Sequence, residues 1–93
     1  MEIIYQKRAL QDLDEWRTSG SKQAQKKISE LLNDIVQHPF TGIGKPEPLK
    51  HQLQGCWSRR ISDEHRLVYE VFEGNIHILS LKGHYSAVAP THP

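Results

Sequence analysis

Apolar residues recur with a helical period in two stretches of the first forty positions. The first stripe, between about residues 7 and 17, consists of Ala9, Leu13 and Trp16. The second stripe consists of Ala24, Ile28, Leu31, Leu32, Ile35 and Val36. Either Ser19 or Ser21 can cap the start of the second helix, and His38-Pro39 ends it. Because only a few residues join the two stretches, they predict an antiparallel pair of helices.

Short alternating runs replace the helical period after a loop rich in proline and glycine. The runs at residues 57–62, 66–72 and 76–81 alternate with the period of two that β-strands show. Asp63-Glu64 predicts a tight link between the first two, and Gly74-Asn75 predicts a two-residue hairpin turn between the last two. A further strand is predicted at residues 2–5. The predicted fold is therefore α+β: a helix pair packed on an antiparallel sheet, in the order β-α-α-β-β-β.

Length and composition allow one compact domain. A chain of 93 residues with 37% hydrophobic and 25% charged side chains buries roughly two-thirds of its unfolded surface around a single core. No apolar run approaches the roughly 18 residues that suggest a membrane span, and no signal-peptide pattern opens the chain, so we expect a cytoplasmic protein. Cys56 is the single cysteine; it cannot form an intrachain disulfide, and we expect a small buried side chain.

Charge is distributed unevenly, although the formal net charge is only +1. Residues 1–40 carry equal numbers of basic and acidic side chains, whereas residues 41–69 carry an excess of basic ones. Five of the six histidines also follow residue 40. The second half of the chain is the better candidate for contacting phosphates, although so modest an excess is also typical of an ordinary solvated face.

Glu47 lies in a stiff segment, because Pro46 and Pro48 restrict the backbone on either side of it. Lys45 and Lys50 are near in sequence, and their positive charge favours the ionised carboxylate that a general base needs. A surface glutamate in a weak ion pair is the alternative interpretation.

Arg60 and Arg66 lie on adjacent predicted strands, so they can project from one face and form a fork for a phosphate or carboxylate. Arg59 should point the opposite way from Arg60. The alternative is a pair of solvent-facing arginines that are salt-bridged to nearby carboxylates.

His84-Tyr85 follows the last predicted strand and places an imidazole and an aromatic ring at the end of the sheet. Histidine can donate a proton near neutral pH, and tyrosine can stack on a base, although a terminal His-Tyr pair is also common on ordinary surfaces. The other histidines show no recognised ligand spacing, so we predict no metal and no cofactor. We interpret Trp16 and Trp57 as packing side chains.

Four segments, in this order and spacing, resemble the YoeB toxins of the RelE superfamily. They are residues 42–51, residues 55–61, residues 64–69 and His84-Tyr85, within a resemblance that covers roughly residues 1–85. The resemblance implies a RelE-like fold, the helix pair on an antiparallel sheet that periodicity predicts. It also implies a ribosome-dependent messenger-RNA endonuclease of a type II toxin–antitoxin system.

The resemblance further implies a role for each candidate residue. Glu47 would be the general base that deprotonates the 2′-hydroxyl, and His84 would be the general acid that protonates the leaving 5′-oxygen. Arg66 would stabilise charge on the phosphate, and Tyr85 would position the nucleotide. The residues expected to bind RNA phosphates are Lys45, Lys50 and Arg60. The expected product carries a 2′,3′-cyclic phosphate, and the scheme requires no metal.

The partners implied by the resemblance are a YefM-type antitoxin, the 70S ribosome with its messenger RNA, and operator DNA contacted through the antitoxin complex. It leaves a homodimer open. An antitoxin segment that is disordered until bound would cover the basic sheet face and compete with RNA.

Two other functions remain open from the sequence. One is a ParE-like gyrase inhibitor that shares the superfamily fold without the chemistry, and the other is a binding module that represses its own operator together with an antitoxin. Two features depart from the family pattern: Cys56 stands where an aromatic residue is frequent, and residues 86–93 extend past the His-Tyr pair. We predict a toxin domain at residues 1–85 and a disordered tail at residues 86–93.

Overall fold

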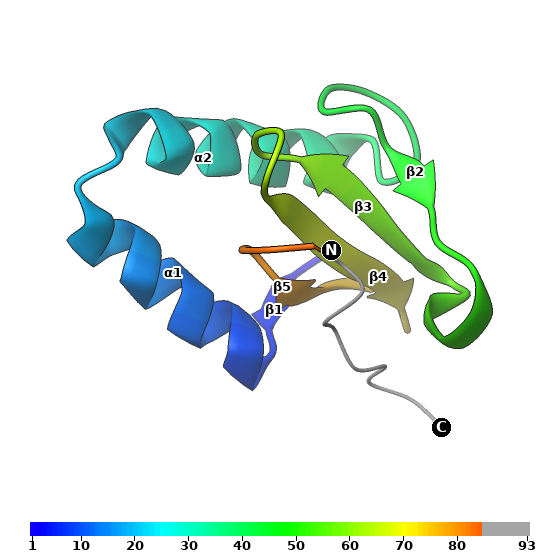
Figure 1. Cartoon of the computed structure of the whole chain (residues 1–93). Helices are drawn as coiled ribbons and strands as arrows, with labels where there is room; N and C mark the ends of the chain where they lie inside the picture. Colours follow the sequence, from blue (N-terminus) through cyan, green and yellow to red (C-terminus); the bar gives the residue numbers. More distant parts are fainter. Residues whose placement is uncertain (85–93) are drawn as a thin grey trace.

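In the computed structural model, which describes residues 1–84, two helices pack on one face of a five-stranded sheet (Figure 1). The strands are β1 (Ile3–Tyr5), β2 (Glu47–Pro48), β3 (Cys56–Arg60), β4 (Arg66–Phe72) and β5 (Asn75–Ser80). The helices are α1 (Lys7–Ser19), α2 (Lys22–Gln37) and the short 3₁₀ helix η1 (His51–Leu53). This arrangement confirms the predicted α+β class and the predicted helix pair.

The polar link between α1 and α2 determines where one helix ends and the next begins. Gly20 follows α1 in the left-handed region (φ 77°), a common way to end a helix. Ser21 caps α2, because its side-chain oxygen accepts a hydrogen bond from the Ala24 backbone N–H (3.3 Å). The other candidate cap, Ser19, instead donates its hydroxyl to the Trp16 carbonyl (2.7 Å).

The sheet is mixed, so the prediction of a fully antiparallel sheet was wrong at one edge. The strand order is β1-β5-β4-β3-β2, and β1 runs parallel to β5, with Ile3 opposite Ile76. Parallel neighbours need a long crossover connection, and here both helices and three strands intervene in the chain. An apolar run predicts burial of a strand but not its direction, which this long-range pairing decides.

The opposite edge carries a strand that the sequence pattern did not predict. β2 contains only Glu47 and Pro48, which lie opposite Ser58 and Trp57 of β3. Two residues are too few to show alternation, and proline within a sheet is tolerated chiefly at an edge. β2 occupies such an edge, so it can carry Pro48.

The hairpin turn between β4 and β5 lies one residue earlier than predicted. Glu73 and Gly74 form it, both with positive φ (51° and 78°), as two-residue hairpins of type I′ require. Asn75 already pairs with Phe72 and therefore belongs to β5.

The connection between β3 and β4 is longer than the predicted tight link. It spans residues 61–65. The backbone N–H groups of Ile61 and Ser62 both donate to the His65 carbonyl (3.0 and 3.2 Å), which closes the loop. Because Ile61 and Ser62 bond within the loop, β3 ends at Arg60.

The sheet has a hydrophobic core on each face. The larger core, between sheet and helices, consists of Ala9, Trp16, Ile28, Leu31, Ile35, Ile61, Leu67, Tyr69, Ile76, Ile78 and Leu81. The smaller core, on the opposite face, consists of Leu49, Leu53, Cys56, Val68 and Leu79. Burial of Trp16 and Cys56 confirms their prediction as packing side chains. Trp57 is half-buried and packs on Phe40, with ring centroids 5.1 Å apart.

The part of the chain that the structure describes ends at His84. Within residues 1–84, no helix is long and apolar enough to cross a membrane. The predictions for Tyr85 and for a tail at residues 86–93 lie outside the described residues.

Candidate active site

Glu47 is exposed on the edge strand β2, where it lies opposite Ser58. Two residues further on, buried Leu49 anchors this segment by donating its backbone N–H to the Cys56 carbonyl (2.9 Å). The ion pairs of residues 1–84 involve other carboxylates. The alternative interpretation of Glu47 as half of a surface ion pair is therefore not realised in this part of the chain.

Arg60 and Arg66 lie directly opposite each other on β3 and β4. Because residues i and i+2 of a strand share a face, Arg60 lies on the same face as Ser58, and Ser58 is opposite Glu47. The register thus brings a carboxylate and two guanidinium groups to one face of the sheet. That face is the one opposite the helices, and it confirms the predicted shared face of the two arginines.

The guanidinium group of Arg66 is held by the loop between β3 and β4. Its Nη1 donates to the carbonyls of Ser62 (2.7 Å), Asp63 (3.2 Å) and His65 (3.2 Å). All three acceptors are neutral, so these hydrogen bonds orient the positive charge without cancelling it. Neither Arg60 nor Arg66 forms an ion pair within residues 1–84, contrary to the salt-bridged alternative.

His84 is exposed and follows a residue that bonds directly to β4. The Arg66 backbone N–H donates to the Gly83 carbonyl (3.0 Å). His84 therefore lies one residue from the point where the chain contacts Arg66. Tyr85, the remaining predicted catalytic residue, is outside the described residues.

Lys45 and Lys50 lie on either side of β2, and both side chains are exposed. Lys50, together with Glu47 and His51, lines a hollow of about 330 Å³. The segment before Lys45 runs beside β3, because the Arg60 backbone N–H donates to the carbonyl of residue 44 (2.7 Å). Both lysines thus belong to the region around Glu47 and Arg60.

A larger hollow, of about 630 Å³, lies elsewhere on the molecule. It is lined by residues of α2 and of the β3–β4 loop, including Lys27, Glu64 and His65. Of the predicted catalytic residues that the structure describes, Glu47, Arg66 and His84, none lines it. Glu47, Arg60 and Arg66 therefore lie on an open sheet face rather than in an enclosed pocket.

Histidine, cysteine and carboxylate side chains do not gather into a metal-binding group of three or more anywhere in residues 1–84. His65 instead has a structural environment: its Nδ1 accepts a hydrogen bond from the Gly83 N–H (2.9 Å), and its ring meets Trp16 edge-on. From the sequence, His65 was considered only as a possible metal ligand, and it lacked a recognised ligand spacing.

Arg59 lies on the predicted face, opposite to that of Arg60, but no role was predicted for it from the sequence. It is 0% exposed and bonds to Asp34 (2.5 Å) and to the Tyr69 hydroxyl (3.1 Å). The same guanidinium group also donates to the carbonyls of His38, Thr41 and Ile43. It therefore fixes the loop that leads from α2 to Glu47. The available signal was a charged residue at an inward position between apolar ones.

Asp34 balances the buried charge of Arg59. The hydrogen bond from Arg59 holds the pKa of the Asp34 carboxyl below its usual value, assisted by the Ile43 N–H, although partial burial acts in the opposite direction. Asp34 also accepts the Ile43 N–H at 3.0 Å. The ion pair thus joins α2, the following loop and β3.

The groups that acid–base chemistry on a phosphodiester uses are present in the described part of the chain. Glu47 can accept a proton, His84 can donate one, and Arg60 and Arg66 can stabilise the charge of a phosphate. The sheet register brings Glu47, Arg60 and Arg66 to one face, and the Gly83 contact places His84 next to the start of β4.

Comparisons with known proteins identify relatives over almost the whole chain. A family model described as YoeB-like toxin of bacterial type II toxin–antitoxin system matches residues 5–85. Toxin YoeB of Escherichia coli K12 is 46% identical over 85 residues, covering 91% of this chain and all of the relative.

Solved structures show the same fold. A YoeB/ParE toxin from Agrobacterium tumefaciens superposes with a TM-score of 0.86 at 34% identity, covering 91% of this chain and 100% of that one. A YoeB–YefM complex and a YoeB dimer, both from Staphylococcus aureus, give TM-scores of 0.79 and 0.80 at 44% identity. Each match covers 91% of this chain and 98% of the other.

Proposed function

The chain belongs to the YoeB-like toxins of bacterial type II toxin–antitoxin systems, and from this membership we propose that it is a ribosome-dependent endonuclease of messenger RNA. The observation that carries the proposal is the directly opposed pair Arg60 and Arg66, on the same sheet face as Glu47. Like charges directly opposite each other destabilise a sheet. An anion such as a phosphate between the two arginines removes that repulsion, so the pair favours phosphate binding.

In the proposed reaction the Glu47 carboxylate takes the proton of a ribose 2′-hydroxyl. The 2′-oxygen attacks the adjacent phosphorus, and the bond from phosphorus to the 5′-oxygen breaks. His84 gives a proton to that leaving oxygen. The products are one fragment ending in a 2′,3′-cyclic phosphate and one beginning with a 5′-hydroxyl. Two side chains carry both proton transfers, so the scheme uses no metal or cofactor.

The cationic side chains stabilise the negative charge that develops during the attack. Arg66 is already oriented by the loop carbonyls, so it need not reorganise as the reaction proceeds. Arg60 assists it, while Lys45 and Lys50 contact the flanking phosphates. Tyr85 positions the nucleotide by stacking on its base.

Dependence on the ribosome is supported by the openness of this face. Glu47, Lys50, Arg60 and His84 are all exposed, and the hollow beside Glu47 has only about 330 Å³. Proteins that hold single-stranded RNA unaided use a basic groove with stacking aromatic rings. A net charge of +1 supplies little general attraction. The 70S ribosome would therefore hold the messenger RNA in the reactive geometry.

The proposed partner is a YefM-type antitoxin, which would also link the toxin to operator DNA. Similarity to the Staphylococcus aureus YoeB–YefM complex at 44% identity supports this partner, and the YoeB dimer from that species supports a homodimer. An acidic or amphipathic antitoxin segment would lie over Arg60, Arg66 and His84. It would neutralise the toxin by occupying the phosphate site.

The test adds the purified protein to a translating bacterial extract and maps the 5′ ends of messenger RNA. Glu47→Gln and His84→Gln remove the proposed base and acid, while Glu30→Gln changes an exposed carboxylate of α2 as a matched control. We expect ribosome-dependent cuts within codons from the parent and the control. Cleavage should be about 10²–10⁴-fold slower in the other two variants. Parental rates in both would contradict the proposal.

A chemically modified substrate tests the nucleophile separately. A messenger RNA with a 2′-deoxynucleotide at the cut position lacks the hydroxyl that Glu47 is proposed to deprotonate. We expect it to remain uncut at that position while neighbouring unmodified positions stay susceptible. Cleavage at the modified position would exclude this mechanism.

A second candidate function is inhibition of gyrase without RNA chemistry, in the manner of ParE. The Agrobacterium tumefaciens structure, named a YoeB/ParE toxin, favours this candidate through its TM-score of 0.86. A DNA supercoiling assay distinguishes the two. Inhibition of gyrase by both the parent and Glu47→Gln, with messenger RNA uncut, would favour the ParE-like function.

A further inference from the structure

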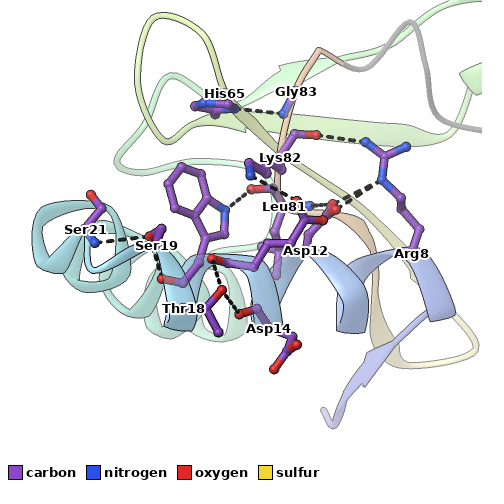
Figure 2. A network of polar contacts seen from close by, with 12 residues as sticks. Arg8, Asp12, Asp14, Thr18, Ser19, Ser21, His65, Leu81, Lys82 and Gly83 are labelled. Atoms are coloured by element: carbon purple, nitrogen blue, oxygen red, sulfur yellow. Dashed lines mark hydrogen bonds and ion pairs between the residues drawn. The ribbon is translucent and has the colours of Figure 1, made fainter.

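Residues 81–83 lie beyond the last strand, but their backbone is fixed by side chains from distant segments (Figure 2). The Leu81 N–H donates to Asp12 Oδ2 (2.9 Å), and the Leu81 carbonyl accepts from the Trp16 indole N–H (2.7 Å). Both partners belong to α1. Both backbone groups of Leu81, the N–H and the carbonyl, are therefore hydrogen-bonded to side chains of α1.

Gly83, which precedes the proposed general acid, is also held from two sides. Its N–H donates to His65 Nδ1 (2.9 Å), and its carbonyl accepts from the Arg66 backbone N–H (3.0 Å). The neighbouring Lys82 carbonyl accepts from Arg8 Nη2 (3.1 Å). Figure 2 shows Arg8, Asp12 and His65 converging on this short segment.

The anchoring side chains are themselves held in place. Asp12 is 3% exposed and also accepts hydrogen bonds from Arg8 Nε (3.2 and 3.3 Å). The His65 ring lies edge-on to Trp16, with centroids 5.0 Å apart and planes at 86°. Trp16 belongs to the main hydrophobic core. Rigid packing thus extends from the core to the backbone of Gly83.

We propose that Asp12 and His65 are positioning residues for His84. They hold the backbone of Leu81 and Gly83, which lie just before His84, and they need not contact RNA. The inference rests on the proposed function, in which His84 is the general acid. A general acid must lie within hydrogen-bond reach of the leaving oxygen, and a misplacement of about 1 Å can slow a reaction about 10²-fold.

Two substitutions of His65 that resemble each other in size and shape separate positioning from folding. In His65→Asn, the side-chain oxygen of asparagine replaces Nδ1 as the acceptor for the Gly83 N–H. In His65→Leu, the leucine side chain is similar in shape to asparagine but offers no acceptor. In ribosome-dependent cleavage we expect kcat to fall about 10–100-fold in His65→Leu, with an unchanged half-saturating ribosome concentration. His65→Asn should recover most of the parental kcat. Equal kcat values in the two variants would overturn the inference.

Hydrogen exchange at the Gly83 amide gives a readout that needs no catalysis. We expect protection in the parent and in His65→Asn, and its loss in His65→Leu. Equal exchange in all three proteins would show that His65 does not anchor Gly83. If the expected exchange is seen but the parent cuts no RNA, the anchor stands while the proposed function, and the role of the anchor in it, fails.

A matched pair of substitutions at Asp12 tests whether the effect on kcat is general to the anchoring residues or specific to His65. Asp12→Asn keeps an oxygen for the Leu81 N–H, whereas Asp12→Leu leaves that buried N–H without an acceptor. We expect kcat to follow the presence of the acceptor at both positions. Melting temperatures of all four variants identify any protein that is not folded at the assay temperature, and a kcat loss that merely follows the unfolded fraction would count against positioning.

Discussion

Replacing Asp34 with alanine should destabilise the protein strongly, because it leaves a wholly buried arginine without its counter-ion. The Arg59 side chain is 0% exposed and the Asp34 side chain is 20% exposed. Removing one partner of a buried ion pair costs about 3–5 kcal/mol, because the other charge stays out of water. Partial exposure of Asp34 lets water replace some of the lost interaction, so we expect about 3 kcal/mol. For a domain of this size that lowers Tm by about 12–24 °C.

Urea unfolding followed by the fluorescence of Trp16 and Trp57 measures this loss. Asp14→Ala, which removes an exposed carboxylate of α1, is the control and should change stability by less than about 0.5 kcal/mol. The double variant Asp34→Ala with Arg59→Met should lose less than the sum of the two single variants, because it leaves no unpaired charge. A loss below about 1 kcal/mol in Asp34→Ala, with an unchanged m-value, would refute the reasoning.

The same ion pair predicts how stability depends on pH. The hydrogen bond from Arg59 lowers the pKa of Asp34 in the folded state below the value of 3.8 for a free side chain. A carboxyl with a lowered folded pKa stabilises the protein above its unfolded pKa and loses that contribution as the pH falls. Asp34→Asn does not titrate, so its free energy of unfolding should decline less steeply below about pH 5. Identical slopes for the parent and Asp34→Asn would contradict this assignment.

Three further predictions concern single positions. Burial, assisted by the charge of Glu70, raises the pKa of the Cys56 thiol to about 11. Iodoacetamide at pH 8 should therefore alkylate Cys56 far more slowly in the native protein than in urea, because the thiolate is the reactive form. Equal alkylation rates would contradict the burial of Cys56. Gly44→Ala should lower the free energy of unfolding by more than about 2 kcal/mol, because the new Cβ would lie 2.6 Å from Leu31 Cδ2. Gly20→Ala, whose Cβ would have nothing within 4 Å, should lower it by only about 1 kcal/mol, because of the positive φ at that position. Urea unfolding that ranks the two variants the other way would refute the packing argument. Glu73→Asn should raise the free energy of unfolding by about 0.5 kcal/mol, and Tm by about 2–4 °C, because asparagine tolerates the positive φ of that turn. A lowered Tm would argue against the turn geometry.

The helices and the three long strands could be predicted because local periodicity reports which face of each element is buried. The direction of β1 could not, because its neighbour Ile76 lies more than seventy positions further along the chain. The turn between β4 and β5 was predicted one residue too late, because a glutamate such as Glu73 does not indicate a positive φ. Local patterns therefore identify elements, whereas pairings between distant segments decide the topology.

The same distinction between local patterns and distant pairings applies to the residues of the candidate site. Alternation around Arg60 and Arg66 correctly placed both arginines on one face, because each lies on a regular strand. The buried role of Arg59 and the anchoring role of Asp12 were not foreseen, since both depend on acceptors and donors contributed by remote loops. Polar side chains that act through the backbone of another segment leave no motif of their own.

The parallel pairing of β1 with β5 also bears on the order in which the sheet is assembled. Glu2 and Asn75, which are hydrogen-bonded at this edge, are 73 residues apart. Closing so long a loop costs entropy before any contact repays it, so we expect this edge to form late in folding. The segment that carries His84 follows β5 directly. Under the proposed function, the strand pairing that closes this long loop therefore involves the strand that directly precedes the general acid.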